Sequence, residues 1–201
     1  MGNVMDHDEI WAEIDHGKTR LAALLDELTP EQWRTPSLCE AWTVRDVAAH
    51  LAIAPTISLR RTVREAVRAR GDFDRMIRVT AIERAAARTD AQILADLRDT
   101  TGARRLAPST FVRDPLLDVL VHTQDIARPL GREVTAPADP ALEALEWTWR
   151  RGFPFWPGRR FRGRRLVATD ADWTRGRGVD LVAPAGDLLL MATGRLPVPA
   201  G

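Results

Sequence analysis

Apolar residues recur at helical spacing through the first three quarters of the chain. From position 8 to 28 they follow the three- and four-residue steps of an amphipathic helix: Ile10, Trp11, Ile14, Leu21, Leu24, Leu25 and Leu28. Gly17 weakens the middle of this segment, because glycine is a poor helix former. Pro30 and Pro36 mark the next segment as a structured loop, which Trp33, Leu38 and Trp42 can anchor on the core. The pattern therefore predicts one long helix followed by a loop.

Four further segments have helical patterns. Thr43 and Asp46 have the spacing of a capping box, in which a threonine N-cap is followed three residues later by an acid. The helix that they open should be kinked or divided at Pro55 and should end at Gly71. Residues 72–88, 90–106 and 138–151 predict three more helices.

The segment 114–128 predicts a helix that is apolar on nearly every side. Asp114 and Pro115 resemble an N-cap and a first helical residue, and Pro129 follows the end. Such a helix belongs inside a protein. It nevertheless carries Asp118, His122 and Asp125, which helical geometry places on one face. An unpaired buried carboxylate costs several kcal/mol, so this stripe needs an explanation.

The composition shifts after about residue 150. Arginines alternate with aromatic residues over 150–165, which predicts a surface loop or linker. Two short strand-like runs follow at 165–170 and 172–183, and 184–195 predicts a short apolar helix. We expect a mainly α protein: a helical bundle over 1–152 and a small α/β segment over 153–201 that is too small to fold alone.

Composition and charge exclude several classes of protein. The 201 residues carry a net charge of +1 and one cysteine, so no disulfide framework forms and no global field attracts nucleic acid. No apolar run approaches about 20 residues, and the N-terminus lacks a secretory apolar segment. We therefore expect a cytoplasmic protein with no membrane and no nucleic-acid partner. The loop 150–165 is more typical of a solvated loop or of a site for an anionic small molecule.

The ionisable stripe suggests a metal site. Asp118 and His122 are one helical turn apart, which is a known way for one helix to offer two ligands. His50 lies among apolar residues on another helix and completes a set of two histidines and one carboxylate. Such a set leaves open coordination positions and suits Zn²⁺ or another divalent first-row metal. The alternative is structural: a buried Asp–His hydrogen bond and a core histidine.

The remaining candidates have several interpretations. Asp125 could orient a ligand histidine, bind substrate or pair with Arg128. Cys39 has no histidine or helix start nearby in the sequence that would activate it, and it is interpreted as a small buried hydrophobe. His7 and His16 lie on polar stretches and should be exposed.

Three stretches together resemble a known family. LTPEQWRTPSLCEAWTVRDVAAHLA is similar to the N-terminal signature of the mycothiol-dependent maleylpyruvate isomerase family, within the DinB-like (YfiT-like) metalloenzymes. DVLVHTQDIARPLG resembles the family's second motif. ATDADWTRGRGVDLVAPAGDLLLMATGR is similar to its small C-terminal domain. The resemblance is weakest between Pro55 and Arg113.

The resemblance implies a DinB-like four-helix bundle with a divalent metal, zinc by preference, bound by His50, Asp118 and His122. Family members commonly have glutamate at the position of Asp118, four residues before the ligand histidine. Aspartate is shorter than glutamate by one methylene. The resemblance also implies mycothiol as thiol cosubstrate, and Arg195 as a residue that could hold a substrate carboxylate. The alternative for Arg195 is a surface residue that interacts with a helix C-terminus.

The leading hypothesis is a metal-dependent enzyme that uses a low-molecular-weight thiol to isomerise a small electrophile or to transfer sulfur to it, with a homodimer as its candidate assembly. A bound metal lowers the pKa of a thiol, so that thiolate forms at neutral pH. The alternative is a non-catalytic DinB-like bundle that binds a metal or a small ligand.

Overall fold

Helices make up most of the structure. The computed structural model describes residues 5–53, 64–65, 68, 72–107 and 110–199. The helices are α1 (His7–Asp26), α2 (Pro30–Trp33), α3 (Val44–Ile53), α5 (Phe73–Ala86), α6 (Asp90–Asp99), α7 (Arg113–Ala127), α8 (Ala138–Arg151), α9 (Pro157–Arg160), α10 (Ala185–Ala192) and the 3-10 turn η2 (Arg128–Leu130). The prediction of a mainly α protein is confirmed. The predicted break at Pro55 and the helix end at Gly71 lie outside the described residues.

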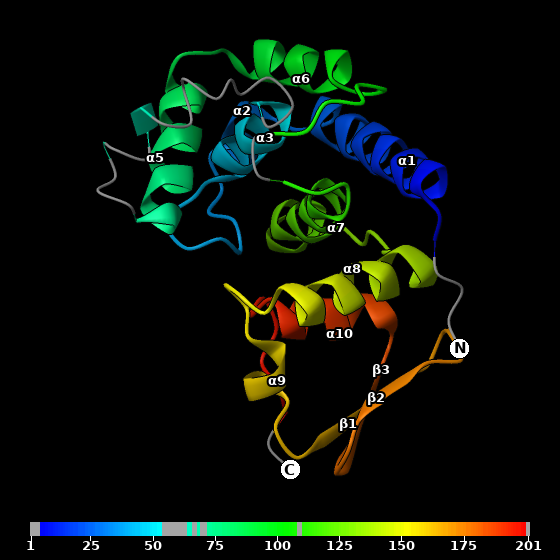
Figure 1. Ribbon diagram of the computed structural model, residues 1–201. Coiled ribbons are helices and arrows are strands. Elements are labelled where there is room, and N and C mark those ends of the chain that lie inside the picture. The colour runs from blue at the N-terminus through cyan, green and yellow to red at the C-terminus, as the bar shows by residue number, and fades with distance from the viewer. Residues whose placement is uncertain (1–4, 54–63, 66–67, 69–71, 108–109, 200–201) are drawn as a thin grey trace.

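Helix α7 lies at the centre of the protein. It contacts α1 and α3 on one side and α8 on the other (Figure 1). Eleven of its fifteen residues are buried, from Leu116 to Ala127 with the exception of Asp118. The apolar pattern thus predicted a central helix correctly, because a helix without a broad polar face has to be covered on several sides.

Helix ends follow local hydrogen bonding, and the prediction was right at α3 and wrong at α7. The Thr43 backbone N–H donates to Asp46 Oδ2 at 2.8 Å, and the Asp46 N–H donates to Thr43 Oγ1 at 3.3 Å, as in a capping box. In α7 the helix already begins at Arg113. Asp114 therefore lies in the first turn, where its Oδ2 accepts from the Phe111 N–H at 2.7 Å.

Helix α6 is shorter than predicted. It ends at Asp99, and the Thr100 N–H donates back to the Asp96 carbonyl at 3.2 Å. Gly102 follows with φ of +82°, a left-handed conformation that ends helices readily. The expected continuation to Leu106 is wrong, because the sequence contains no apolar period strong enough to carry a helix through this glycine.

The C-terminal segment forms a three-stranded sheet and a helix. The strands are β1 (Arg164–Ala168), β2 (Thr174–Gly176) and β3 (Val179–Ala183), in the order β2-β1-β3. Strand β1 pairs antiparallel with β2 and parallel with β3. The second strand-like run of the sequence is therefore two strands, separated at Arg177 and Gly178.

The arginine-rich loop is partly structured, which corrects the expectation of a purely solvated loop. Helix α9 lies within it, and Phe161 is buried. The Phe161 ring stacks on Trp149 of α8, with the ring centroids 5.6 Å apart. One hydrophobic core joins α7 and α8 to β1, β3 and α10, so packing continues across residue 152. The division into units 1–152 and 153–201 stays a prediction. None of the described helices has the length and apolar character needed to cross a membrane.

Replacing Gly178 with alanine should destabilise the sheet strongly. Gly178 has φ of +128°, and an added Cβ would lie 2.0 Å from the Gly163 carbonyl oxygen. That oxygen accepts from the Val179 N–H at 3.0 Å, where the parallel pairing begins. We expect a loss of about 3 kcal/mol in the free energy of unfolding, measured by denaturant titration.

The matched control for this substitution is Gly102→Ala. Gly102 also has a positive φ, but an added Cβ would meet nothing within 4 Å. Its cost should be about 1 kcal/mol, from backbone strain alone. Equal losses in the two variants would show that the contact with Gly163 is not the cause.

Candidate metal centre

Two histidines and one carboxylate from two helices, α3 and α7, lie close together. His50 comes from α3, and Asp118 and His122 come from α7. One ligand atom from each residue lies within 4.8 Å of the other two. The His50 and His122 ring centroids are 5.1 Å apart, and His50 Nε2 lies 3.8 Å from Asp118 Oδ2. Helices α3 and α7 therefore contact each other at the triad, which sequence spacing could suggest but not prove. The Asp118 side chain reaches the cluster although it is shorter than glutamate.

The triad is open on one side. His122 is buried, and the His50 side chain is 16% exposed, whereas the Asp118 side chain is 38% exposed. The expectation of a fully buried stripe is thus wrong at Asp118, because α7 is not covered at this point by the described residues. An open side is what a catalytic metal site needs, since substrate must reach the metal.

Trp42 forms a wall of the triad. Its ring centroid lies 5.3 Å from that of His50 and 5.9 Å from that of His122. Trp42 is itself buried, so it excludes water from one side of both imidazoles. The sequence indicated Trp42 only as an anchor of its loop, since nothing in its local pattern points to the two histidines.

Asp125 lies behind His122. His122 Nδ1 is 2.8 Å from Asp125 Oδ2, which fixes the ring and leaves Nε2 for a ligand. Asp125 is fully buried. Burial raises its pKa, but the hydrogen bond and charge of His122 and the charge of Arg195 outweigh burial and hold the pKa below its ordinary value. The pairing with Arg128 is excluded, because Arg128 instead binds Asp187 at 2.5 Å.

Arg195 reaches the same cluster from the end of α10. Its Nε donates to Asp125 Oδ1 at 3.2 Å, and its Nη1 donates to the Thr193 carbonyl at 3.0 Å. The side chain is only 17% exposed, so the interpretation as a surface arginine is wrong. A guanidinium has five N–H donors, and the contacts among the described residues leave donor capacity for a ligand.

Cys39 lies against the same groups, which the sequence did not indicate. Its Sγ donates to Asp125 Oδ2 at 3.0 Å and lies 3.7 Å from His122 Nδ1. A histidine that is distant in the sequence is therefore next to Cys39 in the structure. The Leu38 N–H donates to the Asp125 carbonyl at 3.1 Å and ties this loop to α7. The local pattern of a sequence does not predict a contact between residues more than 80 positions apart.

A second set of potential ligands shares His122. Cys39, His122 and Asp125 also place ligand atoms within 4.8 Å of one another. Arg195 Nη2, however, lies 3.3 Å from both Cys39 Sγ and Asp125 Oδ2. A fixed guanidinium at this distance repels a divalent cation. The first set, which Asp125 supports from behind, is therefore the better candidate for a metal.

Cys39 should be nearly inert toward alkylation. Burial raises the pKa of its thiol to about 12, with the Asp125 charge as the next cause. Only the thiolate reacts, so iodoacetamide should label the metal-free protein at pH 8 roughly 1000-fold more slowly than a free cysteine. Mass spectrometry of a time course would measure this. The urea-unfolded chain is the control, and equal rates in folded and unfolded protein would contradict the raised pKa of the partly buried thiol.

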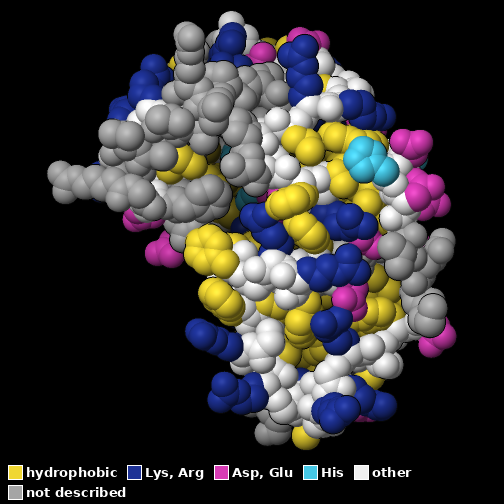
Figure 2. Space-filling view, viewed as in Figure 1, with side chains coloured by type: hydrophobic (Ala, Val, Ile, Leu, Met, Phe, Trp, Pro, Cys, Tyr) yellow, Lys and Arg dark blue, Asp and Glu magenta, His cyan; other side chains and the backbone are white. Residues whose placement is uncertain are grey.

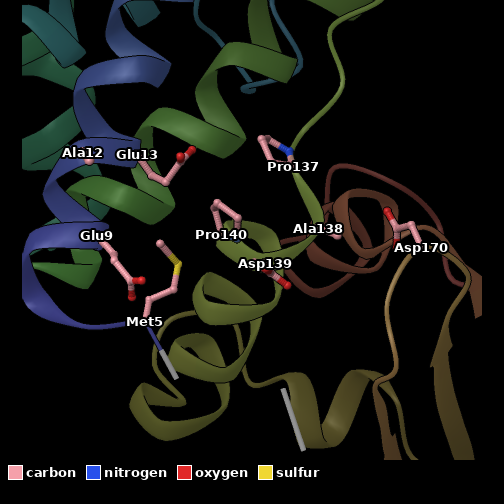
Figure 3. A pocket seen from close by; sticks show the side chains of 9 residues that line it. All are labelled: Met5, Glu9, Ala12, Glu13, Pro137, Ala138, Asp139, Pro140 and Asp170. Atoms are coloured by element: carbon pink, nitrogen blue, oxygen red, sulfur yellow. The ribbon is translucent and has the colours of Figure 1, made fainter. Parts of the chain in front are cut away.

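A separate hollow of about 510 Å³ lies between the N-terminal ends of α1 and α8 (Figure 3). Its acidic lining consists of Glu9, Glu13, Asp139 and Asp170. Two of these carboxylates already accept backbone N–H groups: Glu9 binds the Asp6 N–H, and Asp170 binds the Ala185 N–H. The described residues that line the hollow include no histidine or cysteine, so the triad is the better candidate for a metal site.

The donor set of the triad fits a divalent first-row metal. Two imidazoles and one carboxylate are common protein ligands of catalytic zinc, and three protein ligands leave at least one position for a water or a substrate. The hydrogen bond from His122 to Asp125 is the outer support that metal-binding histidines usually have. His7 and His16, by contrast, are exposed as predicted.

Comparison with known proteins points to one family. The model of the mycothiol maleylpyruvate isomerase N-terminal domain matches residues 14–127, which include His50, Asp118 and His122. The crystal structure of the mycothiol-dependent maleylpyruvate isomerase superposes with a TM-score of 0.53 at 15% identity, over 98% of this chain and 97% of that one. A mutant of the mycothiol-dependent maleylpyruvate isomerase gives a TM-score of 0.47 at the same identity and coverage. No curated protein sequence matches significantly.

Proposed function

This chain belongs to the mycothiol maleylpyruvate isomerase family, and we propose that it is a metal-dependent isomerase with mycothiol as its thiol cosubstrate. The observation that carries the proposal is the meeting of His50, Asp118 and His122, with Asp125 fixing His122 from behind. Such a pre-oriented ligand set is costly to assemble unless a ligand uses it.

In this proposal the three residues hold a divalent metal, with zinc as the best fit to two nitrogen donors and one oxygen donor. A bound divalent metal with an open position would lower the pKa of the mycothiol thiol, so that thiolate is available at neutral pH. His50 and His122 would each bind the metal through one ring nitrogen. Trp42 and the apolar core around α7 keep water from one side of the site.

The protein has one cysteine, and that cysteine is a poor nucleophile. Burial raises the pKa of the Cys39 thiol to about 12, which supports an external thiol as the source of the reactive sulfur. Addition of that sulfur to a carbon–carbon double bond moves the π electron pair onto the substrate and leaves a single bond that can rotate. Expulsion of the same thiolate restores the double bond in the other geometry, so the thiol is regenerated.

Arg195 gives the site its preference for an acid in this proposal. Its guanidinium is fixed by Asp125 and Thr193, and its remaining donor capacity is available to a substrate carboxylate. The proposed substrate is therefore a small unsaturated carboxylic acid. A negative charge bound there also balances the electron pair that moves onto the substrate when sulfur adds.

The test measures metal and activity on the same protein. Purified protein is stripped with a chelator, reloaded with Zn²⁺, and assayed for isomerisation of maleylpyruvate with and without mycothiol. We expect about one metal ion per chain, and activity that requires both the metal and the thiol. A protein that takes up no metal, or that isomerises the substrate equally well without thiol, would overturn the proposal. Metal uptake without catalysis would favour a non-catalytic metal-binding bundle.

A further inference from the structure

An aromatic and arginine cluster lies at the start of α7, outside the triad. It consists of Phe111, Asp114, Trp147 and Arg151, and we name it the rim cluster. The Phe111 and Trp147 rings meet edge to face with centroids 5.4 Å apart. The Arg151 guanidinium lies over both rings, 5.7 Å from Phe111 and 5.8 Å from Trp147. Figure 2 shows that hydrophobic and basic side chains lie close together over much of the face that it draws.

Asp114 holds the rim cluster in a fixed arrangement. Its Oδ1 accepts from Trp147 Nε1 at 2.7 Å, and its Oδ2 accepts from the Phe111 N–H at 2.7 Å. Arg151 Nη1 lies 3.7 Å from the same Oδ2. One carboxylate therefore fixes the Trp147 ring and the Phe111 backbone, and it lies within ion-pair distance of Arg151. Phe111 is nonetheless 56% exposed, so its ring is accessible to a ligand.

The rim cluster is next to the proposed metal site along α7. Asp114, Asp118 and His122 follow one another at four-residue steps, so they share one face of the helix. Each step advances about 6 Å along the axis. The order along this face is thus the rim cluster, then the triad, then Asp125. Because the Asp118 side chain is 38% exposed, the triad opens to solvent on the face that the rim cluster borders.

We propose that the rim cluster binds the part of the thiol cosubstrate that does not react, and that it selects a thiol with a large hydroxyl-rich group over a small thiol. This inference rests on the proposed function. A thiol with its sulfur at the triad has to extend about one turn of α7 to reach Asp114, around which the rim cluster is built. Cysteine alone is too short for this, whereas mycothiol carries an aminosugar and an inositol beyond its N-acetylcysteine unit.

The chemistry of the rim cluster matches such a group. A sugar ring has an apolar C–H face, which packs against the face of an aromatic ring, and an edge of hydroxyl groups. Hydroxyl oxygens can accept from the donors of Arg151, whose one ion pair among the described residues is with an Asp114 oxygen 3.7 Å away. Because the Trp147 ring is already fixed by Asp114, its ordering adds little to the entropic cost of binding.

The experiment compares two thiols on the Zn²⁺-loaded protein by isothermal titration: mycothiol, and N-acetylcysteine, which lacks the sugar and the inositol. The variants are Phe111→Ala and Arg151→Ala, both at exposed positions. The control is Arg175→Ala. Arg175 lies 4.8 Å over Trp149 and pairs with Glu146, on the opposite face of α8, and its side chain is as exposed as that of Arg151 (36%).

We expect Phe111→Ala and Arg151→Ala to weaken mycothiol binding about tenfold each and to leave N-acetylcysteine binding within twofold of wild type. Arg175→Ala should change neither. Unchanged mycothiol binding in both rim variants, or equal weakening of the two thiols, would overturn the inference while the proposed function stands. If the wild-type protein binds neither thiol, both the proposed function and this inference are wrong.

Discussion

The His122→Ala protein should lose at least about 99% of its affinity for divalent metal, a fall of 100-fold or more. His122 contributes one of three proposed ligands and is the only one of them held by a buried carboxylate, through Asp125. The two remaining ligands, His50 and Asp118, lie on separate helices. They would bind a metal weakly, because two metal–ligand bonds do not offset the entropy lost when both side chains are ordered. Competition with a fluorescent zinc chelator measures the change, and thiol-dependent isomerase activity should fall with it.

His16→Ala is the matched control for this substitution. His16 is exposed on α1 and contacts Glu13 at 3.2 Å, so its loss should leave metal affinity unchanged. Circular dichroism and thermal unfolding establish that the His122→Ala chain is folded before its metal affinity is measured. If the folded His122→Ala chain binds zinc as tightly as the His16→Ala chain, the triad is not the metal site.

The sequence was most informative where hydrophobic periodicity decides the structure. The range 138–151 agrees with helix α8 residue for residue, and the apolar pattern of 114–128 indicated the central position of α7. It was least informative about helix ends, which depend on a few polar contacts. The early start of α7 and the early end of α6 depend on individual hydrogen bonds, which compete with several near-equivalent local conformations.

Some residues of the candidate site could also be predicted from the sequence, and others could not. Spacing placed Asp118 and His122 on one face, and a lone histidine in an apolar helix marked His50. Cys39 and Trp42 were missed, because they reach the site through a loop whose path is set by contacts with α7 and α3. The three roles open to Asp125 could be separated only when its partners were known.

The Asp125→Asn protein should be less stable by about 3 kcal/mol, because Arg195 is then left largely buried without its counter-charge. The substitution keeps the shape of the side chain and removes its charge. An amide also supports the proposed imidazole geometry of His122 less well, so metal affinity should fall about 10- to 100-fold. Denaturant unfolding of the metal-free protein and zinc competition measure the two effects separately.

Two further variants separate the two roles of Asp125. Asp187→Asn removes the partner of Arg128 in a pair whose side chains are 38% and 35% exposed, so it should cost less than about 1 kcal/mol. Combining Asp125→Asn with Arg195→Gln removes the unpaired charge. The double variant should regain part of the lost stability without regaining metal affinity, because orientation of His122 still requires the carboxylate. Full recovery of metal affinity in the double variant would mean that Asp125 acts only as the counter-ion of Arg195.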